Sequence, residues 1–216
     1  MAQVFPRSAN AVARVSLVSA LVAPLAIFGA VYFFVRSPYV TQASVPIEQP
    51  IPFSHKHHVG DDGIACEYCH TTVATSPFAG MPSSETCMNC HAQVWNQSDT
   101  LAPVRLSAQT GQPIVWQRVY DLPDFVYFDH SIHVQKGVAC ETCHGRVDEM
   151  PRMMKAASLQ MQWCLDCHRD PVANIRPRED VTIMGWQPPA NIAEIQRQLA
   201  IQSHVQSKTD CSTCHR

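Results

Sequence analysis

Five copies of the motif Cys-x-x-Cys-His contain every cysteine of this chain. In this motif two thiols can form thioethers to the edge of a haem, and the histidine that follows can bind the iron. The cysteines are Cys66, Cys69, Cys87, Cys90, Cys140, Cys143, Cys164, Cys167, Cys211 and Cys214. The motif histidines are His70, His91, His144, His168 and His215. The sequence therefore predicts five covalently bound haem c groups, each with its iron bound on one side by a motif histidine.

Paired cysteines also occur in zinc sites and in disulfide frameworks. A four-cysteine zinc site uses two pairs, so five pairs leave one over, and the histidine after each pair has no role. A disulfide framework does not require ten cysteines to share one five-residue pattern. Both alternatives explain the spacing less well than haem attachment does.

The histidines outside the motifs are candidates for the second axial position of each iron. The chain has 11 histidines, so six lie outside the motifs. Five of these are related by an internal repeat and are the predicted second ligands: His55, His58, His130, His133 and His204. The sixth, His57, has no counterpart and is expected not to bind iron. We expect His55 to serve the first haem and His130 the third, and the other pairings stay open.

The repeat is the pattern Phe-x-His-x-x-His, which precedes the first and the third motif at Phe53 and Phe128. Residues 53–91 and 128–168 read as two copies of a two-haem unit, and residues 191–216 carry the fifth haem. Repeats of this kind predict stacking of equivalent units, here a row of haems.

Methionine is the alternative second ligand, and it would raise the reduction potential of its haem. Met161 and Met154 lie just before the fourth motif and are the possible methionine ligands. Flexible thioether side chains more often fill gaps in packing, so histidine is preferred at each site.

An uncharged apolar stretch over residues 15–35 is long enough to span a bilayer as a helix. Arg7 and Arg14 precede it and no acidic residue does, which predicts a cytoplasmic N-terminus. A cleaved signal peptide is the alternative, although its apolar region is usually only about 7–15 residues long. We expect a single-pass anchor (1–36) in the bacterial inner membrane, a proline-rich linker (37–52) and a periplasmic domain (53–216).

Composition predicts a mainly α fold with much irregular structure and little sheet. The 164 residues from Phe53 onward would hold five haems, which leaves little protein for a core of its own. The 16 prolines also disfavour long regular elements. One longer helix is predicted from Asn191 to about Val205, with Asn191 and Glu194 as a capping box.

Charge and motifs exclude several other functions. Acidic residues outnumber basic ones after Arg36, and no basic patch typical of nucleic-acid binding is present, so no nucleic-acid partner is expected. Phosphate-binding and zinc-protease motifs are also absent. The aromatic stretch over residues 114–128 is expected to lie partly against another chain.

Two segments narrow the prediction, Leu-Pro-Asp-Phe-Val-Tyr-Phe-Asp-His over residues 122–130 and Trp-Cys-Leu-Asp-Cys-His-Arg over residues 163–169. Together with the anchor and the five motifs, they resemble the pentahaem cytochrome subunit of alternative complex III, a membrane quinol oxidoreductase. The Phe-x-His-x-x-His blocks also resemble the small three- and four-haem cytochromes of sulfate- and metal-reducing bacteria.

The resemblance implies an electron-transfer relay that is not an enzyme by itself. Its implied partners are an iron–sulfur subunit, integral quinol-binding subunits, a further cytochrome subunit, membrane lipid and a periplasmic electron acceptor. A stand-alone, membrane-anchored multihaem quinol dehydrogenase is one alternative. A multihaem reductase is another, but it needs an open axial position, and the histidines suffice to close all five irons.

Overall fold

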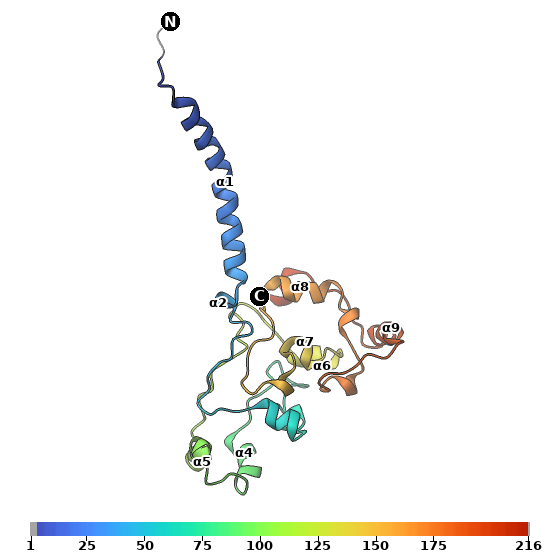
Figure 1. The fold of residues 1–216 in the computed structure, drawn as a ribbon. Coiled ribbons are helices and arrows are strands. Elements are labelled where there is room, and N and C mark those ends of the chain that lie inside the picture. The colour runs from blue at the N-terminus through green and yellow to red at the C-terminus, as the bar shows by residue number, and fades with distance from the viewer. Residues whose placement is uncertain (1–3, 216) are drawn as a thin grey trace. The chain divides into compact units, whose positions relative to one another are not determined.

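The structure is a computed structural model that describes residues 4–215, and it divides into two compact units after Gln42. Within the described residues, extended pairing is limited to isolated bridges such as Val138 with Ile175. The prediction of a mainly helical and irregular fold with little sheet is confirmed (Figure 1).

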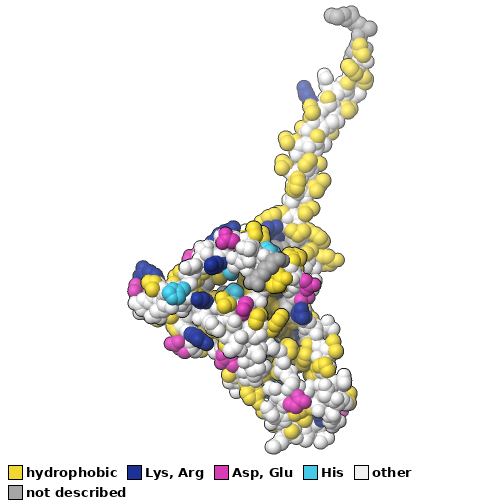
Figure 2. All heavy atoms as spheres, turned by 180° about the vertical axis from the view of Figure 1, so that it is seen from behind, with side chains coloured by type: hydrophobic (Ala, Val, Ile, Leu, Met, Phe, Trp, Pro, Cys, Tyr) yellow, Lys and Arg dark blue, Asp and Glu magenta, His cyan; other side chains and the backbone are white. Residues whose placement is uncertain are grey.

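The first unit is dominated by helix α1 (Ala9–Arg36), which is long and apolar enough to cross a membrane. It begins six residues before the predicted span because the Ala-rich segment after Ser8 readily forms helix. Hydrophobic side chains cover its surface (Figure 2). The helix ends at Ser37, whose backbone N–H and hydroxyl both donate to the Phe34 carbonyl oxygen, at 3.0 and 2.7 Å.

The remaining helices are short. Helix α2 (Pro38–Thr41) closes the first unit. The α-helices of the second unit are α3 (Cys66–Cys69), α4 (Ser84–His91), α5 (Ala102–Thr110), α6 (His130–Gln135), α7 (Cys140–His144), α8 (Met161–Arg169), α9 (Ile192–Gln202) and α10 (Cys211–Cys214). A short π-helix, η1 (Lys56–Asp61), and the 3₁₀ helices η2 (Asp99–Leu101), η3 (Val147–Glu149), η4 (Val172–Asn174) and η5 (Arg178–Asp180) complete it.

The proline-rich segment does not run free up to residue 52. From Ala43 onward it pairs with residues 153–155: the Ser44 N–H donates to the Lys155 carbonyl oxygen at 2.7 Å, and the Ile47 N–H to that of Met153 at 3.1 Å. Extended backbone between prolines keeps free N–H groups, and these bond to a second extended segment. The second unit therefore begins at Ala43, ten residues before the predicted boundary.

The protein core of the second unit is small. One cluster, Ile51, Leu101 and Val104, packs against the second motif at Cys87 and Met88. The other buried apolar residues lie around the third motif and the loop beyond η4: Ala139, Val147, Met150, Ile175 and Val181. Few apolar side chains are thus buried by protein alone, as the composition predicts.

Helix α9 lies where a longer helix was predicted, but the predicted capping box is wrong. The Asn191 side chain makes no capping hydrogen bond. The Glu194 carboxylate instead accepts hydrogen bonds from Arg197 at 2.5 Å and Gln198 at 3.0 Å, one turn further along. His204, with φ +49°, follows the end of the helix.

Candidate haem sites

All five Cys-x-x-Cys-His motifs lie on short helices. The first cysteine begins α3, α7 and α10, and it is the fourth residue of α4 and of α8. Residues three apart occupy the same face of a helix, so the two thiols of each motif lie on one side. This arrangement suits two thioethers to the edge of one haem.

Four motif histidines are oriented by a backbone carbonyl. The Nδ1 atoms donate from His70 to Gly80 (2.8 Å), from His91 to Val94 (3.0 Å), from His168 to Lys208 (2.9 Å) and from His215 to Phe125 (3.1 Å). A carbonyl oxygen accepts only, so Nδ1 carries the proton and Nε2 keeps its lone pair. This is the tautomer that binds a metal through Nε2.

The fifth motif histidine, His144, is held by packing. Its ring lies 4.3 Å from that of Tyr120, centroid to centroid, and the Tyr120 hydroxyl donates to the Cys143 carbonyl oxygen at 3.1 Å. Burial lowers the pKa of His144 to about 4, helped by His130, His70 and His55. Four imidazoles therefore gather at this point.

The two Phe-x-His-x-x-His blocks have the same geometry. Phe53 stacks on His58 at 4.5 Å and 23°, and Phe128 stacks on His133 at 4.6 Å and 26°. The first histidine of each block meets its phenylalanine edge-on, at 4.9 Å and 4.8 Å. The repeat in the sequence is thus a repeat in space.

The second histidine of each block is also oriented alike. Its Nδ1 donates to the carbonyl oxygen four residues earlier, at 2.9 Å from His58 to Ser54 and at 2.7 Å from His133 to Asp129. His130 differs, because its Nδ1 donates to the Pro77 carbonyl oxygen at 2.8 Å, beyond the first motif. All three rings keep Nε2 available for a metal.

Three of the predicted ligands lie opposite a motif histidine. The ring centroids are 6.2 Å apart for His58 and His91, 6.3 Å for His130 and His144, and 6.0 Å for His133 and His168. A metal–imidazole bond is about 2 Å and the ring centre lies roughly 1 Å beyond the nitrogen, so two imidazoles on one metal have centres about 6 Å apart. The donor sets at the second, third and fourth motifs therefore fit an iron between two histidines.

His55 and His204 take part in no such ring pair with a motif histidine within residues 4–215. His55 Nδ1 is buried without a hydrogen-bond partner. Burial lowers the pKa of His55 to about 4, with further lowering by His70 and His58, so His55 lies near the first motif. His204 is exposed.

The other candidate residues have other surroundings. The ring of His57 approaches the carboxylates of Asp61 at 3.8 Å and Asp62 at 3.5 Å, and its place outside the ligand set stays a prediction. Met161 is 66% exposed at the start of α8. Met154 pairs with Pro46 in an isolated bridge.

The first and third motifs share one loop. The Cys140 N–H donates to the Val181 carbonyl oxygen at 3.1 Å, and the Cys66 thiol to that of Thr182 at 4.0 Å. The neighbouring Cys140 thiol lowers the pKa of Cys66, and the Cys66 thiol raises the pKa of Cys140. Burial raises the pKa of Cys143 to about 11. These cysteines, far apart in sequence, lie side by side.

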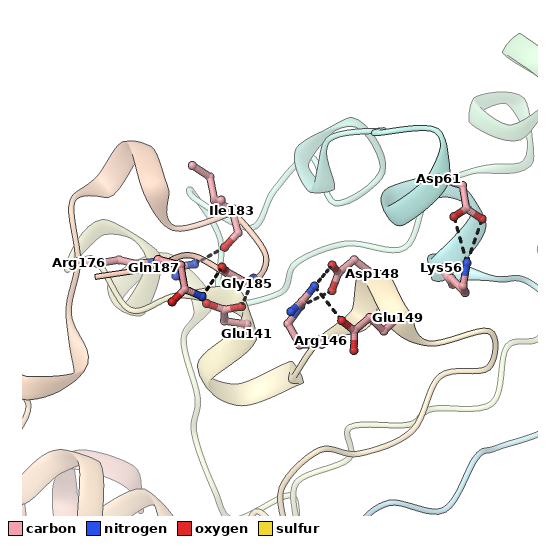
Figure 3. A network of polar contacts seen from close by, with 10 residues as sticks. All are labelled: Lys56, Asp61, Glu141, Arg146, Asp148, Glu149, Arg176, Ile183, Gly185 and Gln187. Carbon is pink, nitrogen blue, oxygen red and sulfur yellow. Dashed lines mark hydrogen bonds and ion pairs between the residues drawn. The ribbon is translucent and has the colours of Figure 1, made fainter. Parts of the chain in front are cut away.

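A buried ion pair fixes this loop, and sequence reasoning missed it. Arg176 is 5% exposed; it donates to Glu141 at 2.7 Å and to the Val181 and Ile183 carbonyl oxygens at 3.1 and 2.8 Å. The Glu141 carboxylate also accepts from the Gly185 N–H at 2.7 Å (Figure 3). Glu141 is the second residue of the third motif, and nothing local in the sequence indicates its distant partner.

A second polar cluster lies beside η1. Arg146 donates to both carboxylate oxygens of Asp148, at 2.8 and 2.6 Å, and contacts Glu149 at 3.0 Å (Figure 3). The Arg146 guanidinium lowers the pKa of Asp148. Lys56 and Asp61 form a more exposed pair at 3.0 Å. On the face in Figure 2 both charge signs are interspersed.

The family described as cytochrome c7 and related cytochrome c matches residues 51–103 and 126–216, well over half of the chain. The menaquinone reductase multihaem cytochrome c subunit of Nitratidesulfovibrio vulgaris is 39% identical over 98 residues, which is 45% of this chain and 46% of the relative. The chain thus matches about half the length of that relative.

Proposed function

Because the chain belongs to the family of cytochrome c7 and related c-type cytochromes, we propose that it carries five haem c groups and relays electrons between a membrane quinone-linked complex and a periplasmic partner. The observation that carries this proposal is the set of three histidine pairs with ring centres 6.0 to 6.3 Å apart. Bound haem supplies one-electron redox chemistry, and the ten cysteines would hold it.

The ring pairs support an assignment of the axial ligands. His91 would share its iron with His58, His144 with His130, and His168 with His133. The two remaining candidates are assigned by elimination and proximity. His55, which is buried near His70, would pair with it, and His204 would pair with His215.

Methionine ligation is the less favoured assignment at the fourth site. His133 already lies opposite His168, which is near the C-terminal end of α8. Met161 is largely exposed at the start of the same helix. Closing both axial positions with histidine leaves no position for a substrate, which favours electron transfer over a reductase reaction.

A haem count and a ligand-binding test decide between the five-haem relay and the reductase alternative. Mass spectrometry of the purified chain should show five attached haems, and carbon monoxide should leave the reduced spectrum unchanged. Fewer haems would contradict the count. A strong high-spin, carbon monoxide-binding haem would favour the reductase alternative.

The direction of electron flow separates two versions of the relay. We propose quinol as donor, with partners like those of alternative complex III: an iron–sulfur subunit, integral quinol-binding subunits and a further cytochrome. The relative's name, menaquinone reductase, favours the opposite direction, toward menaquinone. Reduction of the haems by added quinol in native membranes, compared with reduction by a periplasmic donor, distinguishes them.

Affinity purification from native membranes tests the partners. Recovery of the chain alone, still oxidising quinol, would support the stand-alone dehydrogenase instead of a complex subunit. Recovery with integral and iron–sulfur subunits would support the relay. The exposed aromatic side chains Phe125 and Tyr127, which are 63% and 53% exposed, would then lie partly at an interface.

We further propose that α1 anchors the chain with its N-terminus in the cytoplasm. Arg7 and Arg14 at the start, and a helix whose apolar side chains are exposed, support this orientation. Reporter fusions at the two ends of the chain test it: a cytoplasmic reporter should be active only at the N-terminus.

A further inference from the structure

We infer that the five attachment sites form one unbranched row in the order second, first, third, fourth, fifth, so that the second and fifth sites are its ends. This inference rests on the proposed haem content, and it goes beyond it by naming the path and the two places where electron partners exchange electrons with this chain. Each link of the row has its own contacts.

The second site adjoins the first. The Asn89 side chain, between the cysteines of the second motif, donates to the Tyr68 hydroxyl, between those of the first, at 3.0 Å. The turn at η1 serves both sites: His58 lies opposite His91 of the second motif, and His55, three residues earlier, lies near His70 of the first.

The first site adjoins the third. Val181 and Thr182 are consecutive: the Val181 carbonyl oxygen accepts from the Cys140 N–H of the third motif, and the Thr182 carbonyl oxygen lies 4.0 Å from the Cys66 sulfur of the first. From the other side, the loop after the first motif orients a ligand of the third site, because Pro77 accepts the Nδ1 hydrogen bond of His130 at 2.8 Å. No corresponding contact from the second motif to the third is found within residues 4–215.

The third, fourth and fifth sites follow in sequence order. Helix α6 carries His130 opposite His144 of the third motif and His133 opposite His168 of the fourth. His168 in turn donates to the Lys208 carbonyl oxygen at 2.9 Å, three residues before the fifth motif begins. The fourth site therefore lies between the third and the fifth.

The exposure of the motif cysteines agrees with these two ends. Cys90 of the second motif and Cys211 of the fifth are exposed, whereas the other eight motif cysteines are partly buried. A redox group exchanges electrons with a separate protein only where it reaches the surface. Partners would thus meet this chain at the second and fifth sites, and the sites between them would conduct.

The test follows one electron through the full haem-loaded chain in detergent. The substitution His58→Met marks the second site, because a ferric haem with a methionine ligand has a long-wavelength band that reduction removes. Methionine also raises the potential, so an electron that reaches this site stays there. A ruthenium photosensitiser on Gln206→Cys, an exposed position just before the fifth motif that creates no new Cys-x-x-Cys pair, is the source. The excited complex loses one electron, and the ferric iron at the second site gains it.

Light should bleach the band in this marked protein. Removing the first attachment site with Cys66→Ala and Cys69→Ala should abolish the bleaching, because the second site then has no neighbour. If the row ran in sequence order, the first site would be a dead end and the bleaching would persist, which would overturn the inference.

Two controls separate the possible failures. With the first site removed, a photosensitiser on the exposed Gln97→Cys, beside the second motif, should still bleach the band and so show that this haem is present. The mass of the parent protein reports the haem number: fewer than five haems contradicts the proposed function, whereas five haems with persistent bleaching contradicts only the order.

If the variant lacking the first site does not accumulate, an experimental structure of the haem-loaded parent decides the order of the sites. The haem on Cys87 and Cys90 should then lie nearer to that on Cys66 and Cys69 than to that on Cys140 and Cys143. The reverse would overturn the order.

Discussion

The imidazole rings of His130 and His144 lie almost parallel, with planes 11° apart and centroids separated by 6.3 Å. The two residues come from different helices, α6 and α7, joined by a short loop through Gly137. Two rings in this relation can share one iron between them, which makes the third site the most direct place to test the ligand assignment.

We expect His130→Ala to open one axial position at the third site. The change should convert one haem in five to a high-spin form that binds carbon monoxide, since the other imidazoles near His144, those of His70 and His55, are assigned to the first site. Optical titration of the reduced protein with carbon monoxide measures it. His57→Ala is the matched control and should leave the spectrum unchanged, because His57 contacts Asp61 and Asp62. A carbon monoxide-free spectrum of His130→Ala would refute the assignment.

Arg176→Leu should destabilise the protein by about 3–5 kcal/mol, because removing one partner of a buried ion pair leaves the other charge uncompensated. The acceptors that would lose their Arg176 donor are the Glu141 carboxylate and the carbonyl oxygens of Val181 and Ile183. Guanidinium unfolding of the haem-loaded protein, followed by circular dichroism, gives the free energy of unfolding.

The control for this change is Arg197→Leu, which removes an exposed ion pair with Glu194. Exposed pairs contribute less than about 1 kcal/mol, so this variant should unfold almost as the parent does. If the two variants lost equal amounts of unfolding free energy, burial of Arg176 would add nothing to its contribution to stability.

Gly137→Ala should cost about 3 kcal/mol, since two penalties combine at this position. Its φ of +87° is strained for any residue with a Cβ atom, and that atom would overlap the Arg176 carbonyl oxygen. Gly111→Ala is matched for backbone strain alone: its φ is +70°, but its Cβ would enter open space. This control should cost only about 1 kcal/mol. The difference between the two unfolding free energies measures the cost of the overlap between the new Cβ atom and the Arg176 carbonyl oxygen.

Asp148 should make stability depend on pH on the acid side. Its pKa is lowered in the folded protein by the hydrogen bonds from Arg146, so its contribution is full above the unfolded pKa, about 3.9. The contribution is lost as the pH falls through the lower, folded pKa. Asp148→Asn should therefore be less stable than the parent at pH 7, and the difference should shrink in acid.

The comparison for this titration is Asp121→Asn, since Asp121 forms an exposed pair with Arg118. That variant should differ from the parent by less than about 1 kcal/mol at every pH. A parent–Asp148→Asn difference that stays constant down to pH 2 would contradict the role given to Arg146.

The motif residues could be placed from sequence because their geometry is local. Two cysteines three apart on one turn of helix need no distant contact to face the same way. The Phe-x-His-x-x-His repeat likewise predicted equivalent surroundings, and the stacking of Phe53 on His58 matches that of Phe128 on His133.

The distant contacts could not be predicted in the same way. His58 lies opposite His91, 33 positions away, because the path of the chain between them brings the second motif back to η1. The pairing of Ala43 with Lys155 was missed because a high proline content predicts a semi-rigid extended spacer, although the residues between prolines still form backbone hydrogen bonds. Arg176 gave no local signal, since only its tertiary contact with Glu141 distinguishes it from a surface arginine.

Helix α6 is only six residues long, and it carries the rings that lie opposite both His144 and His168. One turn of backbone hydrogen bonds therefore sets the offset between the two rings, and thermal motion of the surrounding loops displaces them together. Tunnelling between the third and fourth sites would be insensitive to loop fluctuations that alter the outer steps. This central step should consequently vary least with temperature and solvent viscosity.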